Sequence, residues 1–143
     1  MPTKAFEQAI GFYQIPGQSI SLPLVSVNLL QPDGNRVTLP LLFDTGASFL
    51  TLRNDLYPIL GLTSWDSGEP VPVNTAGSAA PVTAYKYQTT IEFLGVIVDC
   101  PVLLQQLPHN PLWMGLFGRE QIFNRFGFGF WESSQELLIT ATP

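Results

Sequence analysis

Residues Leu39–Leu52 have the sequence LPLLFDTGASFLTL, in which an apolar run ends abruptly at an acidic residue. A short apolar run bounded by turn residues is typical of a buried strand, here Leu41–Phe43. Because burying an unpaired carboxylate costs several kcal/mol, Asp44 needs a compensating loop. Gly46 allows the backbone to turn close to that carboxylate, and Thr45 adds a hydroxyl that can hold the loop. The stretch therefore predicts a strand, a tight loop that carries Asp44, and a second apolar strand.

A second motif lies near the C-terminus, where Leu112–Glu120 has the sequence LWMGLFGRE. Two hydrophobic residues are followed there by Gly118 and Arg119. Together with the hydrophobic residues that precede Asp-Thr-Gly-Ala-Ser, this motif resembles the retropepsin-like family of single-domain aspartic proteases. The resemblance spans about Ser21 to Thr140. It implies an all-β fold with one short helix, namely a retropepsin-like acid protease half-barrel that is closed as a homodimer.

The family pattern places the strand of the second motif beside the catalytic loop, with Arg119 opening a short helix at Glu120–Asn124. It assigns residues 19–143 to the protease domain and leaves residues 1–18 as an N-terminal arm, in which Ala5–Ile10 is compatible with a helical turn. Turn residues between apolar segments predict further elements: a hairpin of Ser19–Leu30 and Arg36–Phe43, a helical turn within Arg53–Leu62, and a terminal hairpin of Phe126–Trp131 and Glu136–Thr140.

Amide hydrolysis in this family uses two aspartates that activate one water. The sequence offers one credible catalytic aspartate, so the resemblance implies that the second is Asp44 of another copy across a twofold axis. The implied partners are therefore a second copy of the chain and an extended peptide substrate. No cofactor and no metal are expected.

Site residues follow from the same resemblance. Asp44 is the expected catalytic residue, Thr45, Gly46, Ala47 and Ser48 form the active-site loop, and Gly118 and Arg119 form the structural second motif. Strand alternation places Leu42 on the face of Asp44, and the second-motif strand offers Met114 and Leu116. These apolar residues predict pockets for hydrophobic side chains on either side of the cleaved bond. Trp65, Trp113 and Trp131 are expected in the core or an interface rather than in contact with substrate.

Residues Val71–Val98 predict a long hairpin with a small-residue turn at Asn74–Pro81. In the retropepsin-like family this position is taken by the flap, a hairpin that closes over the substrate. The resemblance therefore assigns substrate contacts to Ala76, Gly77 and Ser78 at its tip. A plain surface loop is the alternative interpretation of this small-residue stretch.

One residue departs from the family pattern, and one triplet elsewhere in the chain imitates it. Viral members often carry an aspartate where this chain has Ser48, so the partner of Arg119 is open. The triplet Asp66-Ser67-Gly68 superficially copies a second catalytic motif. We reject it because no apolar strand precedes it, and because Asp66 follows Asp44 too closely for a second lobe to lie between them.

Composition limits the other function classes. A chain of 143 residues with 45% hydrophobic and 12% charged residues predicts one domain with ample core and an apolar interface with a partner. Six scattered basic residues and a net charge of −5 argue against nucleic acid as a partner. The single Cys100 and single His109 are too few for a Cys/His zinc site. Without an apolar leader or a membrane-spanning run, the sequence predicts no membrane association and a cytoplasmic location.

Two other functions stay open on the sequence. One is a catalytically inactive dimeric module of the same fold that grips an extended peptide, since fold does not imply activity. The other is a β-barrel that binds an apolar small molecule, which the apolar composition alone suggests. The intact Asp-Thr-Gly triplet favours the protease over both.

Overall fold

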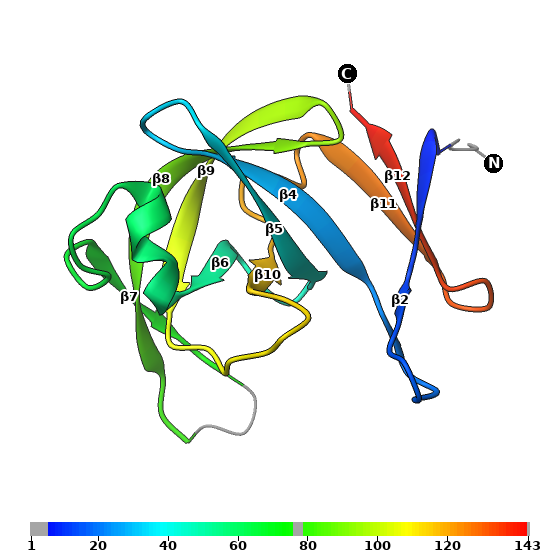
Figure 1. Cartoon of the computed structure of the whole chain (residues 1–143), viewed down its shortest axis with the longest axis horizontal. Coiled ribbons are helices and arrows are strands. Elements are labelled where there is room, and N and C mark those ends of the chain that lie inside the picture. The colour runs from blue at the N-terminus through cyan, green and yellow to red at the C-terminus, as the bar shows by residue number, and fades with distance from the viewer. Residues whose placement is uncertain (1–5, 76–78, 143) are drawn as a thin grey trace.

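The computed structural model describes residues 6–75 and 79–142 of the chain, which fold mainly into β-strands (Figure 1). A seven-stranded mixed sheet contains most of the chain, in the order β4-β5-β10-β6-β9-β8-β7, and β4 also pairs with β8. Its strands are β4 (Leu24–Leu30), β5 (Arg36–Phe43), β6 (Leu50–Arg53), β7 (Glu69–Val73), β8 (Val82–Phe93), β9 (Val96–Gln105) and β10 (Gly115–Phe117). This arrangement confirms the expected β fold and the predicted hairpin of β4 and β5.

One face of this sheet packs against the hydrophobic core, and every second side chain along β4 and β5 points to that face. Val25, Val27 and Leu29 of β4 are buried, and the residues between them are more exposed. Leu39, Leu41 and Phe43 repeat the pattern on β5. This period of two is what a sheet with one covered face requires, and it places the residue after Phe43 on the other face.

A smaller sheet of three strands, β1-β12-β11, carries both ends of the described chain (Figure 1). We call it the terminal sheet. It comprises β1 (Gln8–Gly11), β11 (Phe126–Trp131) and β12 (Glu136–Ala141), and a short pair, β2 (Tyr13–Gln14) and β3 (Ser21–Leu22), follows β1. The helical turn expected at Ala5–Ile10 is wrong from Gln8 onward. So short a helix is marginal by itself, whereas β12 supplies antiparallel partners from Gln8 to Gly11.

Eight phenylalanines join the terminal sheet to the main sheet. Phe43, at the end of β5, has its ring centroid 4.8 Å from that of Phe128 and 5.2 Å from that of Phe130. The same group continues through Phe12, Phe93, Phe117, Phe123 and Phe126. The strand that leads to Asp44 is therefore fixed from both sheets.

The described chain contains one helix, the 3₁₀ helix η1 (Asn54–Leu60), which confirms the turn expected within Arg53–Leu62. Gly61 ends it in the left-handed conformation, with a φ of 75°. The helix expected at Glu120–Asn124 is wrong, because this segment forms hydrogen-bonded turns. Gln121 has a φ of 63°, which interrupts helical geometry. No helix in residues 6–75 and 79–142 is long and apolar enough to cross a membrane.

Candidate active site

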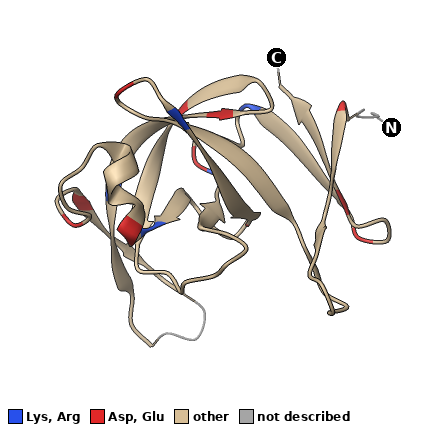
Figure 2. Cartoon of the chain, viewed as in Figure 1, with Lys and Arg blue, Asp and Glu red and all other residues tan. Residues whose placement is uncertain are grey.

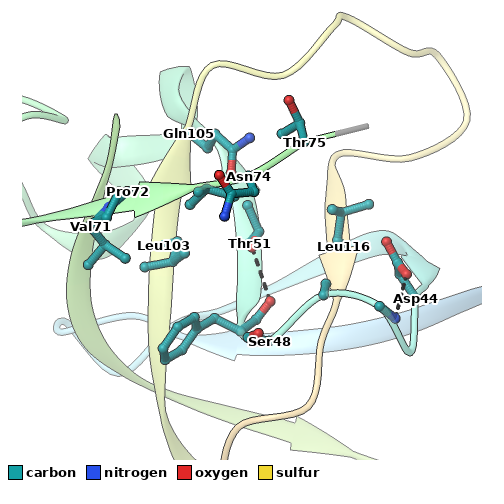
Figure 3. Close-up of a pocket in the computed structure, with 14 residues that line it drawn as sticks. Asp44, Ser48, Thr51, Val71, Pro72, Asn74, Thr75, Leu103, Gln105 and Leu116 are labelled. Carbon is teal, nitrogen blue, oxygen red and sulfur yellow. Dashed lines mark hydrogen bonds between the residues drawn. The ribbon is translucent and has the colours of Figure 1, made fainter. Parts of the chain in front are cut away.

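Asp44 lies immediately after β5, at the start of a tight loop. Its backbone N–H donates to the carbonyl oxygen of Phe117 at 3.2 Å, which ties the loop to β10. The N–H of Gly46 donates to Oδ1 of Asp44 at 2.9 Å, and the N–H of Ala47 donates to the Asp44 carbonyl at 3.2 Å (Figure 3). The sequence thus supplies both the acidic group and the donor that orients it.

The second motif holds this loop from the other side. β10 runs parallel to β5 and antiparallel to β6, so Leu116 lies beside both Leu42 and Thr51. The N–H of Arg119 donates to the Ala47 carbonyl at 3.1 Å. At Gly118 the backbone passes so close to the Phe49 carbonyl that a Cβ would overlap it. Glycine is required there by this close approach.

A cleft of about 570 Å³ opens beside the Asp44 loop (Figure 3). Four groups of residues line it: the loop and β6, the β7 strand with the two residues after it, the end of β9, and β10. These residues are Asp44, Gly46, Ala47, Ser48, Phe49, Thr51, Val71, Pro72, Val73, Asn74, Thr75, Leu103, Gln105 and Leu116. In Figure 3, Asp44 and Leu116 are at the right of the cleft, and Val71, Pro72 and Leu103 are at its left.

A family model for aspartyl proteases matches residues 25–120, more than half of the chain. The chain belongs to this aspartyl protease family. The match contains both the Asp44 loop and the Gly118-Arg119 motif, and the family includes retropepsin-like members. A search of curated proteins found no match.

The aspartyl protease fold brings several expected site residues together. Gly46, Ala47, Ser48 and Leu116 line the cleft with Asp44, and Thr45 is exposed on the same loop. The described lining does not include Leu42 or Met114: Leu42 is half-buried beside Leu116, and Met114 packs against the hydrophobic core. The positions expected at the hairpin tip, Ala76, Gly77 and Ser78, lie outside the described residues.

Two lining groups were missed by the sequence reasoning. Val71 and Val73 alternate along β7, and Leu103 and Gln105 alternate along β9. The structure confirms the strands of the hairpin predicted at Val71–Val98, since β7 pairs with β8 from Glu69 to Val73. A strict count of alternation along Val102–Gln105 would have separated the core face from the cleft face.

Neither Arg119 nor Asp66 is part of the described cleft lining. Arg119 is exposed, and its side chain makes no ion pair with any described carboxylate. Its role within the described structure is carried by its backbone. Asp66 is exposed in the loop before β7, where the hydroxyl oxygen of Tyr87 accepts hydrogen bonds from the backbone N–H groups of Ser67 and Gly68. The structure thus gives Asp66 no place beside Asp44.

Charge around the cleft is sparse, and the described basic residues are scattered over the molecule (Figure 2). Arg53, at the end of β6, has its Nε 2.6 Å from Oδ1 of Asp55. This hydrogen bond, together with the charge of the Arg53 guanidinium, holds the pKa of Asp55 below its usual value. The guanidinium beside the cleft is therefore already paired.

Proposed function

We propose that the protein is a homodimeric aspartic endopeptidase, in which Asp44 of each of two copies activates one water. The observation that carries this proposal is the oriented Asp44 carboxylate at one end of an open cleft, in a chain of the aspartyl protease family. One copy offers one carboxylate there, and the chemistry of the family needs two.

A second copy is supported by the surface around the loop. Thr45 and Gly46 are exposed next to Asp44, as residues that meet a symmetry mate would be in an isolated chain. Large apolar side chains are also exposed on β11 of the terminal sheet and on the β2–β3 hairpin: Phe130 and Trp131 on the first, and Tyr13 and Ile20 on the second. Apolar surface of this kind marks an interaction site.

The proposed chemistry divides two roles between two equivalent carboxyl groups. Carboxylates about 3 Å apart do not both ionise, so the pair shares one proton. The ionised group takes a proton from water as the water oxygen forms a bond to the carbonyl carbon of the peptide, and the protonated group gives its proton to the carbonyl oxygen. The C–N bond of this tetrahedral intermediate then breaks as a proton passes to the leaving nitrogen, which yields a carboxylic acid and an amine. We expect a bell-shaped rate profile with an optimum at roughly pH 4–6. At higher pH the pair loses its shared proton and therefore its acid, and at lower pH both carboxyl groups are protonated and the base is lost.

The substrate fits as an extended peptide that runs along the cleft below the β7–β8 hairpin. Ala47 and Leu116, close to Asp44, offer apolar contacts. We therefore propose hydrophobic residues beside the cleaved bond. The hairpin would act as the flap of this enzyme.

The decisive experiment mixes two forms of the chain. Purified wild type is titrated with Asp44→Asn protein while cleavage of a hydrophobic peptide library is followed. If each site needs two Asp44 groups, Asp44→Asn alone is inactive, and its excess suppresses the wild type because mixed dimers lack one carboxylate. Sedimentation at the assay concentration measures the dimer in each mixture.

Asp66→Asn is the matched control, since it removes a carboxylate from the other Asp-Ser-Gly or Asp-Thr-Gly triplet. It should cut at the wild-type rate and should not suppress it. Turnover by purified Asp44→Asn, or full activity in a chain that sediments as a monomer, would refute the proposal.

A further inference from the structure

Two polar side chains are buried among the described residues, and both belong to the cleft. Thr51 is 4% exposed and Gln105 is 5% exposed. Every other buried side chain in the described structure is hydrophobic. Since burying a polar group is unfavourable unless it is hydrogen-bonded, two such groups in one cleft require a reason.

Strand register places the two side chains on one face. β6 and β9 are parallel neighbours, with Thr51 paired to Leu103 and Arg53 paired to Gln105. Leu50, Leu52, Val102 and Leu104 point into the hydrophobic core, so the residues between them point to the opposite face. Thr51, Leu103 and Gln105 therefore share the face that lines the cleft.

The two groups differ in how they are satisfied. The Thr51 hydroxyl donates to the Phe49 carbonyl at 3.0 Å. The side-chain amide of Gln105 carries two donor hydrogens and an acceptor oxygen, and makes no hydrogen bond within the described residues. Because no fully buried side-chain nitrogen or oxygen there lacks a partner, the amide must keep contact with the open space of the cleft that Gln105 lines. Asn74 and Thr75, which follow β7, bring further polar groups to the cleft lining (Figure 3).

Charge decides what could occupy this place. Asp44 is the one charged residue in the described lining. Two cations lie close to the cleft, and both already have a carboxylate partner: Arg53 is paired with Asp55, and Lys86, whose Nζ is 5.8 Å from the centre of the Phe49 ring, is paired with Glu69 at 3.6 Å. A charged substrate side chain would lose water there without gaining an opposite charge, which is costly. A purely apolar side chain would leave the Gln105 amide without a partner. An uncharged amide side chain can both donate to Gln105 and accept from it.

We propose that Gln105 forms a polar subsite that selects an asparagine or glutamine side chain in the substrate, a few positions from the hydrophobic residues at the cleaved bond. This inference rests on the proposed peptidase function and specifies its substrate. The cleft thus recognises two features of a peptide: apolar side chains that bind near Asp44, and a side-chain amide that binds near Gln105.

The first arm of the test uses cleavage. Peptides that the wild type cuts are varied at each position among Gln, Glu, Met and Leu, which are similar in length. At one position Gln should exceed Glu and Met by about tenfold in kcat/KM, because a site built for hydrogen bonding rejects analogues that lack the matching groups. Gln105→Leu should remove this preference and still cut the Met peptide.

The second arm does not depend on catalysis. The Asp44→Asn protein is panned against the same peptides, and retention is compared with that of an Asp44→Asn/Gln105→Leu double variant. Selective retention of amide-containing peptides by the first protein alone supports the subsite even if cleavage is never seen. The two arms therefore separate failure of the subsite from failure of the proposed peptidase function.

Gln88→Leu is the matched control, because Gln88 is exposed on β8 and is not part of the described cleft lining. It should leave the preference unchanged. Gln105→Met, which is closer in shape to glutamine, replaces Gln105→Leu if the latter does not fold. The proposal is overturned if neither wild type in the cleavage arm nor the Asp44→Asn protein in the binding arm prefers amide-containing peptides, or if the preference survives both Gln105 substitutions.

Discussion

The loop around Asp44 and the terminal sheet are held in place by different means. The loop is enclosed between β5, β10 and β6, with backbone groups so close that neither Gly115 nor Gly118 has room for a Cβ. The terminal sheet is an antiparallel ribbon on which Gly11 has open space, and Phe130 and Trp131 are 45% and 57% exposed. The Asp44 loop is therefore held in position by contacts within one chain, whereas the terminal sheet exposes large apolar side chains to solvent.

This difference separates two requirements of the proposed two-chain active site. The position of each carboxylate must be fixed before the chains meet, because a small displacement of a catalytic group is costly in rate. The surface that joins the chains must remain open until they meet. The eight-phenylalanine cluster connects the two, since Phe43 precedes Asp44 and contacts the rings of Phe128 and Phe130.

The largest expected effect comes from adding one methyl group to the Asp44 region. Gly118→Ala forces a Cβ into the Phe49 carbonyl, so the loop or β10 must shift. We expect a loss of at least about 3 kcal/mol in the free energy of unfolding, with loss of cleavage. Chemical denaturation measures the first and a peptide assay the second.

The control is the same substitution in the terminal sheet. Gly11→Ala meets no atom within 4 Å, and so should leave stability unchanged or raise it slightly. Equal losses at Gly11 and Gly118 would show that the two regions do not differ in the way described.

The second prediction concerns the open surface. Trp131→Ser should weaken the proposed dimer at least about tenfold, because exposed aromatic side chains commonly carry the binding energy of interfaces. The monomer should keep its melting temperature, and activity should fall at low protein concentration. Sedimentation equilibrium and activity on dilution measure both effects.

Ile97→Ser is the matched substitution outside the terminal sheet, since Ile97 is 53% exposed on β9. It should leave the dimer intact. Normal association by Trp131→Ser would mean that the two chains meet through another surface.

The contrast also shows what the sequence could reveal. The strands around Asp44 were predictable, because alternation, turn residues and the two motifs are local signals in Leu39–Leu52 and Leu112–Glu120. The pairing of β1 with β12 was not, since its partners are separated by nearly the whole chain and Gln8–Gly11 carries no strong local signal. The turns at Glu120–Asn124 were not predictable either, because the positive φ of Gln121 depends on its surroundings.

For the candidate site, the sequence predicted the Asp44 loop but not the residues of β7 and β9 that line the opposite side of the cleft. Asp44 and Gly118 belong to short sequence motifs that can be recognised without a structure. Gln105 stands at the end of an apolar strand and becomes informative only through its 5% exposure, which is a property of the folded chain. Burial of a polar side chain depends on neighbours that are distant in sequence, so no local pattern reports it.

A smaller effect tests whether the two regions act as one unit. Phe43 and Phe128 come from the main and terminal sheets, with ring centroids 4.8 Å apart at 60°. The single substitutions Phe43→Leu and Phe128→Leu should each destabilise, and the double variant should lose less than their sum. We expect a coupling of about 0.5–1.5 kcal/mol from a double-mutant cycle in denaturant. Strict additivity would mean that the terminal sheet is energetically separate from the strand that precedes Asp44.

The smallest expected effect concerns charge and pH near the cleft. The Arg53 hydrogen bond lowers the pKa of Asp55 below its usual value of 3.8, so the folded state binds this proton less readily than the unfolded state. The ion pair therefore contributes its full stability above the ordinary Asp range, and loses it as pH falls through the lower, folded-state pKa. Because the Asp55 side chain is 46% exposed, solvent screening limits the contribution to about 0.2–1 kcal/mol. Comparing denaturation of wild type and Asp55→Asn should show this small difference at pH 5, and it should shrink toward zero below about pH 3. A region held by backbone contacts rather than by charge should thus keep its loop in the acidic range where the proposed peptidase works. A large loss of stability in Asp55→Asn at pH 5 would show instead that the Arg53–Asp55 pair is a main support of the cleft.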